Sequence, residues 1–323
     1  MNRLCARPAS QAITTNNLAI LGSPTELEVV RLIDSLSELD HPPLLIDTSE
    51  FPRRHALGFS DCGWQYDSVS LNGIKAFFLR SLHCNDWHKQ DSGKGQKDGE
   101  PLHLQLRTLR EKDSMLGSLL RWAVTHGKPV VNPLSTLLCH YYKLHTVDHL
   151  KQVGIPVPTT FAGNDSESVK GFVARHEQVI CKPLAGGAEA VALTAEDLSP
   201  EFLDRLSEAP VLLQERIHGT DVRAYVLGGQ IIAAGALVTD RVDFRTGPQN
   251  FEPTPLSPEE CLDLVKTARA MHLAFAGIDF KRTEAGRHVI LDVNPAPMFA
   301  GFERLTGLDI AGPIASFLIE MSG

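Results

Sequence analysis

The alternation of apolar and polar positions predicts strands and helices that follow one another along the first third of the chain. Short apolar runs at residues 18–21 and 43–46 are typical of buried strands. Between them, Ser23-Pro24-Thr25-Glu26 has the pattern of a helix start, which predicts a helix to about Leu39. A strand, a helix and a strand in this order indicate a parallel pair with a right-handed crossover. We therefore expect an α/β unit over residues 18 to about 130.

The rest of this unit is predicted from turns and from helical spacing. Val69 to Leu79, with Asn72-Gly73 in the middle, is expected to form a hairpin. Leucines near helical spacing predict a long helix over residues 102–125 that stops at Gly127. Between these elements, residues 89–100 include no apolar side chain, so the segment 88–101 is expected to be a surface loop. We interpret it as a tolerated insertion, with a substrate lid as the alternative.

The second half of the chain alternates helices with strand pairs. A Gly228-Gly229 turn predicts a hairpin, and Ser257 with Glu260 predicts a capped helix whose apolar stripe, from Leu262 to Phe275, packs on a sheet. Further expected helices cover residues 136–152, 166–176 and 309–321, and further expected strands cover residues 179–182, 211–215, 222–227 and 231–237.

The last predicted hairpin concentrates oxygen donors at one place. Its strands, residues 276–280 and 288–293, are separated by a Glu284-Ala285-Gly286 turn. Side chains alternate along a strand, so Asp292 and Asn294 share a face and Asp279 on the partner strand can reach it. Two carboxylates and an amide suit Mg²⁺ bridged to phosphates. The alternative is that Asp279 begins a turn and Asn294-Pro295 ends a strand.

Composition narrows the classes of protein that need to be considered. The 323 residues are 43% hydrophobic and 22% charged, which is enough for two or three lobes with a sizeable core. A formal charge of −8 argues against nucleic acid or an anionic membrane as a partner. No apolar run approaches the ~20 residues of a membrane span, and the first residues lack the apolar core of a signal peptide. The six cysteines have no paired spacing, as is typical of reduced thiols, so we expect a soluble cytoplasmic protein.

The donor cluster lies in a segment that resembles a known family. Asp279, then residues 292–297, 301–303 and 306–311, are similar to the C-terminal magnesium motif of ATP-grasp ligases, in the RimK-like and glutathione-synthetase-like branch. Motifs in the family's order extend over residues 132–319. One departure is Asp292, where the family usually has glutamate; the shorter side chain puts the usual bridging of two metal ions in doubt.

This resemblance implies a mixed α/β and α+β chain with the ATP-grasp fold. The expected domains are an N-terminal Rossmann-like (pre-ATP-grasp) domain, residues 1–131, a small central lid domain, residues 132–213, and a C-terminal ATP- and magnesium-binding domain, residues 214–323. The implied cofactors are ATP and one or two Mg²⁺ ions, with Mn²⁺ as a substitute, and the implied metal ligands are Asp279, Asp292 and Asn294.

Two lysines and a glycine turn are candidates for holding phosphate. Lys182 ends an apolar strand and precedes Gly186-Gly187, whose backbone N–H groups can approach phosphate oxygens. The spacing matches neither a Walker loop nor a Rossmann loop. In the resemblance, Lys182 matches the phosphate lysine, Lys143 matches a lysine that contacts the nucleotide phosphate, and the glycine turn matches a lid over ATP.

The same resemblance assigns roles to the strands that follow. Gln214, Glu215, Arg216 and Ile217 match the strand end whose backbone binds adenine, and Asp221 matches the residue that binds ribose. Arg223 matches an arginine that faces the phosphate or the acyl group. Arg241 and Arg245 match arginines that hold the transferring phosphate and the substrate carboxylate, a task that suits the planar guanidinium fork. The alternatives are a solvated hinge glutamate and an ordinary cross-strand Asp–Arg pair.

The implied activity is that of an ATP-dependent ligase, which joins a carboxylate to an amine through an acyl phosphate. The substrate is expected to be a peptide or an amino acid, and residues 44–52, the Arg80 strand and residues 243–245 resemble the peptide-modifying members. A homo-oligomer is compatible with this interpretation. The alternatives are a small-molecule amino-acid ligase, an ATP-grasp kinase or phosphotransferase, and a non-catalytic ATP-binding regulatory module.

Overall fold

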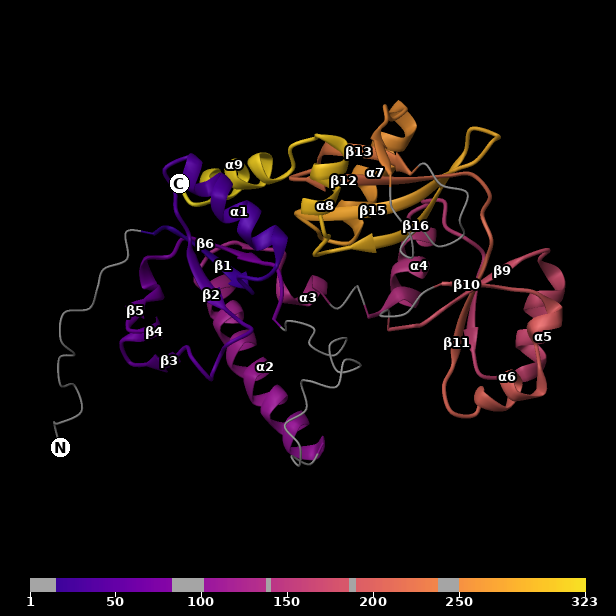
Figure 1. The fold of residues 1–323 in the computed structure, drawn as a ribbon, viewed down its shortest axis with the longest axis horizontal. Coiled ribbons are helices and arrows are strands. Elements are labelled where there is room, and N and C mark those ends of the chain that lie inside the picture. Colours follow the sequence, from indigo (N-terminus) through magenta and orange to yellow (C-terminus); the bar gives the residue numbers. More distant parts are fainter. Residues whose placement is uncertain (1–15, 83–101, 138–140, 186–189, 238–249) are drawn as a thin grey trace. The chain divides into compact units, whose positions relative to one another are not determined.

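The computed structural model describes residues 16–82, 102–137, 141–185, 190–237 and 250–323, shown as a ribbon in Figure 1. The chain divides into two compact units: residues 1–134 together with 311–323, and residues 135–310. The predicted loop 88–101 and the candidate residues Gly186, Gly187, Arg241 and Arg245 lie outside the described residues. The division into three domains at residues 132 and 214 stays a prediction.

The first unit is built around a parallel sheet with the strand order β2-β1-β6-β7. The predicted parallel pair is confirmed, because β1 and β2 run in the same direction on either side of α1 in the sequence. Helix α1 packs against α9, and Figure 1 shows these two helices on one side of the sheet and α2 on the other. The bounds are β1 (Leu18–Gly22), β2 (Leu44–Asp47), β6 (Ala76–Leu79), β7 (Val130–Val131), α1 (Leu27–Glu38), α2 (Leu102–Thr125) and α9 (Ala311–Met321).

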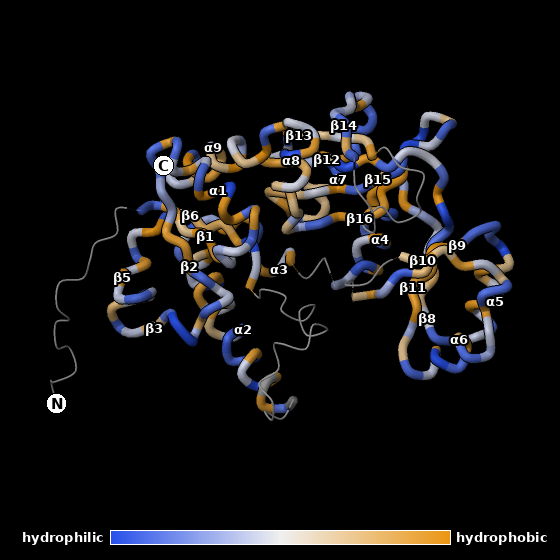
Figure 2. Tube along the Cα trace, in the orientation of Figure 1, coloured by the Kyte–Doolittle hydropathy of each residue, from blue (hydrophilic) through white to orange (hydrophobic). Residues whose placement is uncertain are grey.

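The bounds of α2 agree with the prediction, whereas α1 begins later than predicted. Helix α2 has the predicted bounds and is followed by Gly127 at a left-handed φ of 70°. Figure 2 shows apolar and hydrophilic positions interleaved along it, as helical spacing requires. Helix α1 begins at Leu27 instead of Pro24, because Ser23 and Glu26 close a separate turn: the Glu26 N–H donates to the Ser23 carbonyl and the Ser23 N–H donates to the Glu26 carboxylate.

The predicted hairpin from Val69 to Leu79 is wrong. Strand β5 (Val69–Ser70) pairs with β4 (Gly63–Tyr66), which pairs in turn with β3 (Leu57–Ser60). The Asn72-Gly73 step lies in the 3₁₀ helix η1 (Leu71–Gly73), and β6 leaves it to join the parallel sheet. All four residues of β6 are buried, and this unbroken apolar pattern is typical of a central parallel strand.

The second unit begins with a four-stranded antiparallel sheet in the order β10-β9-β11-β8. Its core is made by Val169, Phe172 and Val173 of α5 against the strand residues Val179 and Leu213. The bounds are β8 (Thr160–Gly163), α5 (Ser166–Arg175), β9 (Val179–Lys182), β10 (Val191–Leu193), η4 (Ala195–Asp197), α6 (Pro200–Arg205) and β11 (Val211–Glu215).

A five-stranded antiparallel sheet in the order β14-β13-β12-β15-β16 completes the second unit. The bounds are α3 (Leu134–Leu137), α4 (Lys143–Gln152), β12 (Thr220–Leu227), β13 (Gln230–Leu237), β14 (Phe251–Pro253), α7 (Pro258–Ala270), β15 (Phe275–Arg282), β16 (His288–Asn294) and α8 (Ala300–Thr306). The single helix predicted over residues 136–152 is therefore wrong, since α3 and α4 are separate elements. Within the described residues, no helix is both long and apolar enough to cross a bilayer.

One face of this sheet is apolar and the other is charged. Along β12, Val222, Ala224 and Val226 are buried in a core with Leu264 and Ala268 of α7, which packs on β12, β13 and β15 as predicted. Leu262, which we expected in the apolar stripe, is 68% exposed, because the buried face of α7 runs through Leu264 instead. The residues that alternate with this core, Asp221 and Arg223 among them, lie on the opposite face of the sheet.

The capping carboxylate of α7 also ties this helix to the sheet. Glu260 forms the predicted capping box with Ser257, and its carboxylate accepts hydrogen bonds from Arg282 Nε at 2.7 Å and Nη2 at 2.9 Å. Burial alone would raise the pKa of Glu260, but the Arg282 guanidinium and the Ser257 N–H hold it below its usual value. The folded state therefore gains stability from the ionised carboxylate above the unfolded pKa, and this gain is lost as the pH falls through the folded pKa.

Replacing Glu260 with alanine is expected to lower the free energy of unfolding by about 2–3 kcal/mol at pH 7, since the change removes a helix cap and leaves Arg282 without its carboxylate partner. Urea unfolding at pH 7 and at about pH 3.5 measures this difference, which should shrink in acid. The neighbouring exposed Glu259 is the control, because Glu259→Ala should change stability by about 0.5 kcal/mol or less. An equal loss in both variants would contradict the role of Glu260.

Candidate functional site

The predicted oxygen donors share one face of the five-stranded sheet. Asp279 of β15 lies directly opposite Asp292 of β16, and Asn294 lies opposite Gly277. Asp279 is inside β15, before the turn that follows Arg282, so the alternative in which Asp279 begins a turn is wrong. The strand register therefore places two carboxylates and an amide along one short stretch of the sheet.

A one-residue irregularity in β16 makes this arrangement possible. Phe280 pairs with Ile290 while Asp279 pairs with Asp292, so Leu291 is an extra residue between the two pairs. Without it, strict alternation would put Ile290 and Asp292 on the same face. The bulge allows Ile290 to pack in the apolar core while Asp292 lies opposite Asp279 on the charged face.

Asp279 is held by an arginine of the neighbouring strand. Arg223 Nε donates to Asp279 Oδ1 at 2.6 Å and Nη2 donates to Oδ2 at 2.7 Å, a bidentate pair across β12 and β15. Burial works against the charge on Arg223, but the Asp279 carboxylate outweighs it and raises the pKa of Arg223 above its usual value. Arg223 therefore stays cationic and fixes the orientation of the Asp279 carboxylate.

A second ion pair continues the row of charges along the same two strands. Lys281 Nζ donates to Asp221 Oδ2 at 2.7 Å, while the cross-strand Asp–Arg pair of the alternative interpretation is formed by Arg223 with Asp279. Burial raises the pKa of Asp221, while the charges of Lys281 and Lys182 act in the opposite direction. Lys182, the predicted phosphate lysine, therefore lies close enough for its charge to lower the pKa of Asp221.

The loop after β16 orients the amide among the donors. The Ala296 N–H donates to Asn294 Oδ1 at 2.9 Å, which fixes the side-chain oxygen. Pro297 folds back over the partner strand, where a Cβ added to Gly277 would lie 2.5 Å from the Pro297 Cβ. Only glycine leaves room for this loop, so the site requires Gly277 although glycine has no functional side chain.

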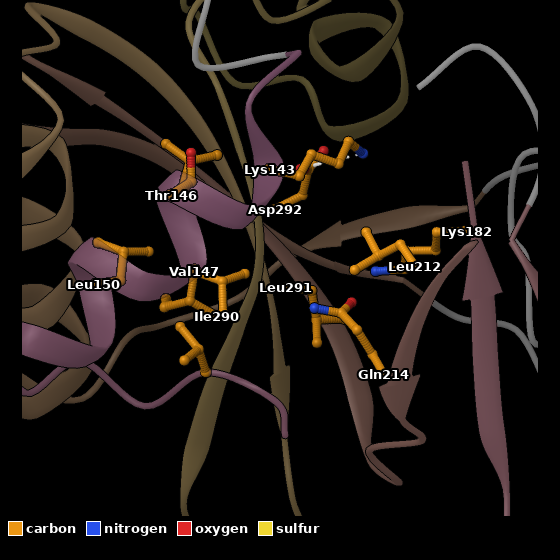
Figure 3. A pocket seen from close by; sticks show the side chains of 12 residues that line it. Lys143, Thr146, Val147, Leu150, Lys182, Leu212, Gln214, Ile290, Leu291 and Asp292 are labelled. Carbon is orange, nitrogen blue, oxygen red and sulfur yellow. Dashed lines mark ion pairs between the residues drawn. The ribbon is translucent and has the colours of Figure 1, made fainter. Parts of the chain in front are cut away.

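A cleft of about 430 Å³, measured out to solvent, lies beside these donors within the second unit. Lys143 at the start of α4 pairs with Asp292 of β16 at 3.7 Å, and Figure 3 shows Thr146, Val147 and Leu150 of α4 on one side of the cleft and Lys182, Leu212 and Gln214 of β9 and β11 on the other. The lining residues are Lys143, Thr146, Val147, Leu150, Val157, Lys182, Leu212, Gln214, Ile290, Leu291, Asp292 and Val293. A cleft lined by two lysines and by apolar side chains suits an amphipathic ligand that carries negative charge.

The other predicted adenine contacts lie next to this cleft without lining it. The carboxylate of Glu215 accepts from the Thr159 N–H at 2.8 Å, so its side chain links β11 to the start of β8, unlike the predicted alternative of a solvated glutamate. The Arg216 side chain binds Gln178. Of residues 214–217, Gln214 has its side chain in the cleft, and Ile217 follows in the segment between β11 and β12.

The donor set fits a hard divalent cation. Among the described residues, no group of three or more histidine, cysteine, aspartate and glutamate side chains could hold a metal ion. The set at Asp279, Asp292 and Asn294 has two carboxylates and takes its third oxygen from an amide, a combination suited to Mg²⁺. Each Asp279 oxygen that accepts from Arg223 keeps a further lone-pair site, so the arginine does not exclude an ion.

Sequence patterns missed several residues of this site. Lys281 follows Asp279 by two positions, so period-two alternation could have placed it on the same face. Leu150, Val157 and Ile290 carry only apolar side chains, and no local signal separates a cleft wall from a core. Thr160 contacts Gln214 because β8 pairs with β11, and this pairing could not be predicted from the sequence.

Comparisons with known proteins agree on one family. A family model described as the RimK-like ATP-grasp domain matches residues 141–318. A protein named probable alpha-L-glutamate ligase from Picosynechococcus sp. (strain ATCC 27264 / PCC 7002 / PR-6) is 29% identical over 188 residues, which cover 54% of this chain and 62% of that relative. The match therefore spans less than two thirds of that relative's length.

Solved structures extend the similarity over nearly the whole chain. The structure of the ATP-grasp ligase PsnB complexed with a minimal precursor is 31% identical, with a TM-score of 0.84, and the match covers 95% of this chain and 100% of PsnB. A PsnB structure complexed with a minimal precursor, Mg and ADP is 30% identical, with a TM-score of 0.83, and covers 96% of this chain and 99% of PsnB.

Proposed function

Because the chain belongs to the RimK-like ATP-grasp family and has the predicted ATP-grasp fold, we propose that it is an ATP-dependent carboxylate–amine ligase. The observation that carries this proposal is the cleft between α4, β9, β11 and β16, which is lined by Lys143, Lys182 and Asp292, with Lys143 paired to Asp292. Cations beside carboxylates suit a polyphosphate that is accompanied by a metal ion. Gly186 and Gly187, beyond the described residues, are proposed to complete the phosphate site.

Each charged residue then has a proposed task. Asp279, Asp292 and Asn294 would hold Mg²⁺, which when bound would neutralise charge on the phosphates. Lys143 and Lys182 bind and orient the phosphate groups, and Arg223 orients Asp279. Asp221, held by Lys281, is proposed to bind the ribose, and Gln214 to Ile217 to bind the base. Arg241 and Arg245 are proposed to hold the transferring phosphate and the substrate carboxylate; the number of ions and the use of Mn²⁺ stay predictions.

We propose a peptide as the substrate, with the acid activated as an acyl phosphate that an amine opens to an amide. The similarity to PsnB, which is named in complexes with a minimal precursor and with a precursor peptide, supports this choice. The curated relatives named as glutamate ligases favour an amino-acid substrate as the second candidate. A homo-oligomer stays compatible with both.

The test is an ATP-consumption screen with Mg²⁺ against acids, amino acids and short peptides, with products read by mass. We expect ADP formation that depends on both an acid and an amine, with a product that has lost one water. A stable product that has gained a phosphate, formed without amine, would establish the kinase alternative. Tight ATP binding without turnover on any acid would establish the regulatory module.

A further inference from the structure

Tyr225 is a fully buried tyrosine on the same face of the sheet as the proposed metal ligands. It lies in β12 two residues after Arg223, so alternation along the strand places its side chain on the charged face. The strand register puts Tyr225 opposite Gly277, and Gly277 opposite Asn294. Because Gly277 has no side chain, the Tyr225 ring can extend over it: a Cβ added to Gly277 would lie 3.7 Å from Tyr225 Cε1. The tyrosine therefore reaches from β12 toward the end of β16.

The Tyr225 hydroxyl binds the main chain of the loop that links β16 to α8. Tyr225 Oη donates to the Met298 carbonyl at 2.7 Å, and the ring packs edge-on against Phe302 of α8 with 5.0 Å between the ring centroids. At the start of the same loop, the Ala296 N–H donates to Asn294 Oδ1 at 2.9 Å. The loop is thus fixed at one end to the central strand of the sheet and at the other end to the amide of Asn294.

Arg223 fixes the direction of the hydrogen bond that Tyr225 makes. Burial opposes the charge on Arg223, whereas the Asp279 carboxylate and a side-chain hydrogen bond with Tyr225 raise its pKa. An arginine can only donate hydrogen bonds and a carbonyl can only accept them. The Tyr225 oxygen therefore accepts from Arg223, and its single proton goes to the Met298 carbonyl. This chain of hydrogen bonds connects the ion pair that holds Asp279 with the loop that orients Asn294.

We propose that Tyr225 is a positioning residue of the metal site, whose hydroxyl holds the β16–α8 loop in the shape that keeps the Asn294 oxygen directed at the ion. This proposal rests on the proposed function, in which Asp279, Asp292 and Asn294 hold Mg²⁺. Asp279 and Asp292 lie inside paired strands, whereas Asn294 is the last residue of β16 and depends on the loop for its orientation. Without the hydroxyl, the loop loses its anchor on β12 and Asn294 is less well oriented toward the ion.

The test is the Mg²⁺ dependence of ADP binding, measured by calorimetry, because this measurement does not require turnover. Tyr225→Phe keeps the ring and removes only the hydroxyl. We expect the Mg²⁺ concentration that gives half of the maximal enhancement of ADP binding to rise about tenfold, because removing a group that orients a metal ligand weakens metal binding. ADP binding without Mg²⁺ should stay within about twofold, since Lys143 and Lys182 are unchanged.

Tyr66→Phe is the matched control for the loss of a buried tyrosine hydroxyl. Tyr66 is 4% exposed in the first unit, and its hydroxyl accepts from the Asp47 N–H at 2.9 Å. Both variants should lower the midpoint of urea unfolding, because each removes a hydrogen bond of a buried tyrosine. Only Tyr225→Phe should change the Mg²⁺ dependence. An equal shift in Tyr66→Phe would make the effect a consequence of lost stability and would overturn the proposal.

A double variant tests whether Tyr225 acts through Asn294. Asn294→Ala alone should raise the Mg²⁺ requirement by about tenfold or more, because it removes a ligand. Adding Tyr225→Phe to Asn294→Ala should then change the requirement by less than about twofold, since the side chain that the hydroxyl orients is gone. Full addition of the two effects, or an unchanged Mg²⁺ dependence in Tyr225→Phe alone, would overturn the proposal. Absence of Mg²⁺-dependent ADP binding by the unmodified protein would instead overturn the proposed function, and this proposal with it.

Discussion

Replacing Lys182 with alanine is expected to lower kcat/KM for ATP-dependent product formation by on the order of 10²–10³ without unfolding the protein. Lys182 ends β9, lines the cleft and lies close enough to Asp221 to act on the pKa of that carboxyl. Its backbone is held opposite Leu212 in the β9–β11 ladder, so its ammonium extends from a fixed strand as charge develops on a transferring phosphate. Steady-state kinetics with the product found in the screen measures the loss.

A lysine on α5, which packs on the same four-stranded sheet, is the control that separates the loss of activity from a general change in charge. Lys170 lies on α5, is 47% exposed and pairs with Glu167 one turn away. Lys170→Ala removes the same charge and should leave kcat/KM within about twofold, since exposed ion pairs contribute little. Unfolding midpoints of both variants should match that of the unmodified protein. Near-normal kcat/KM in Lys182→Ala would remove Lys182 from the phosphate site.

Local signals predicted those elements that are specified by neighbouring residues. The capping box of Ser257 and Glu260 gave the start of α7, and the glycine turn at Gly228-Gly229 gave the β12–β13 hairpin. The Asn72-Gly73 turn led to the wrong hairpin because turn propensity does not indicate which strands pair. Val69–Ser70 pairs with β4, which precedes it in the sequence, and β6 pairs with the distant strand β1. Long-range strand register overrode the local signal.

The candidate site shows the same difference between residues placed by local signals and residues placed by long-range strand pairing. The shared face of Asp279, Asp292 and Asn294 was predicted because one hairpin fixes their register over a few residues. The bulge at Leu291 was not predicted, although it permits Ile290 to be buried while Asp292 lies on the opposite face of the sheet. Thr160 and Gln214 are 54 positions apart, and only the β8–β11 ladder brings them together. Residues whose role is to orient another side chain carry no signal of their own in a single sequence.

Replacing Asp292 with asparagine is expected to raise the Mg²⁺ concentration needed for half-maximal activity by roughly tenfold to a hundredfold, since it removes a charged ligand and keeps the shape. Asp292 is opposite Asp279 in the ladder, and its side chain is 39% exposed in the ion pair with Lys143. An ion pair this exposed contributes little to folding, so stability should change by about 1 kcal/mol or less. Magnesium titrations of both activity and ADP binding measure the effect.

Two further variants locate the cause of that shift. Asp292→Glu supplies the residue usual in the family and should retain activity with a near-normal Mg²⁺ requirement, because it keeps the charge and lengthens the arm. Glu284→Gln removes one charge from the exposed turn of the same hairpin and should leave the titration unchanged. If Asp292→Asn also left the Mg²⁺ titration unchanged, the metal ligands would lie elsewhere, and the pair Asp279 and Asp292 would be a structural feature of the sheet held by Arg223 and Lys143.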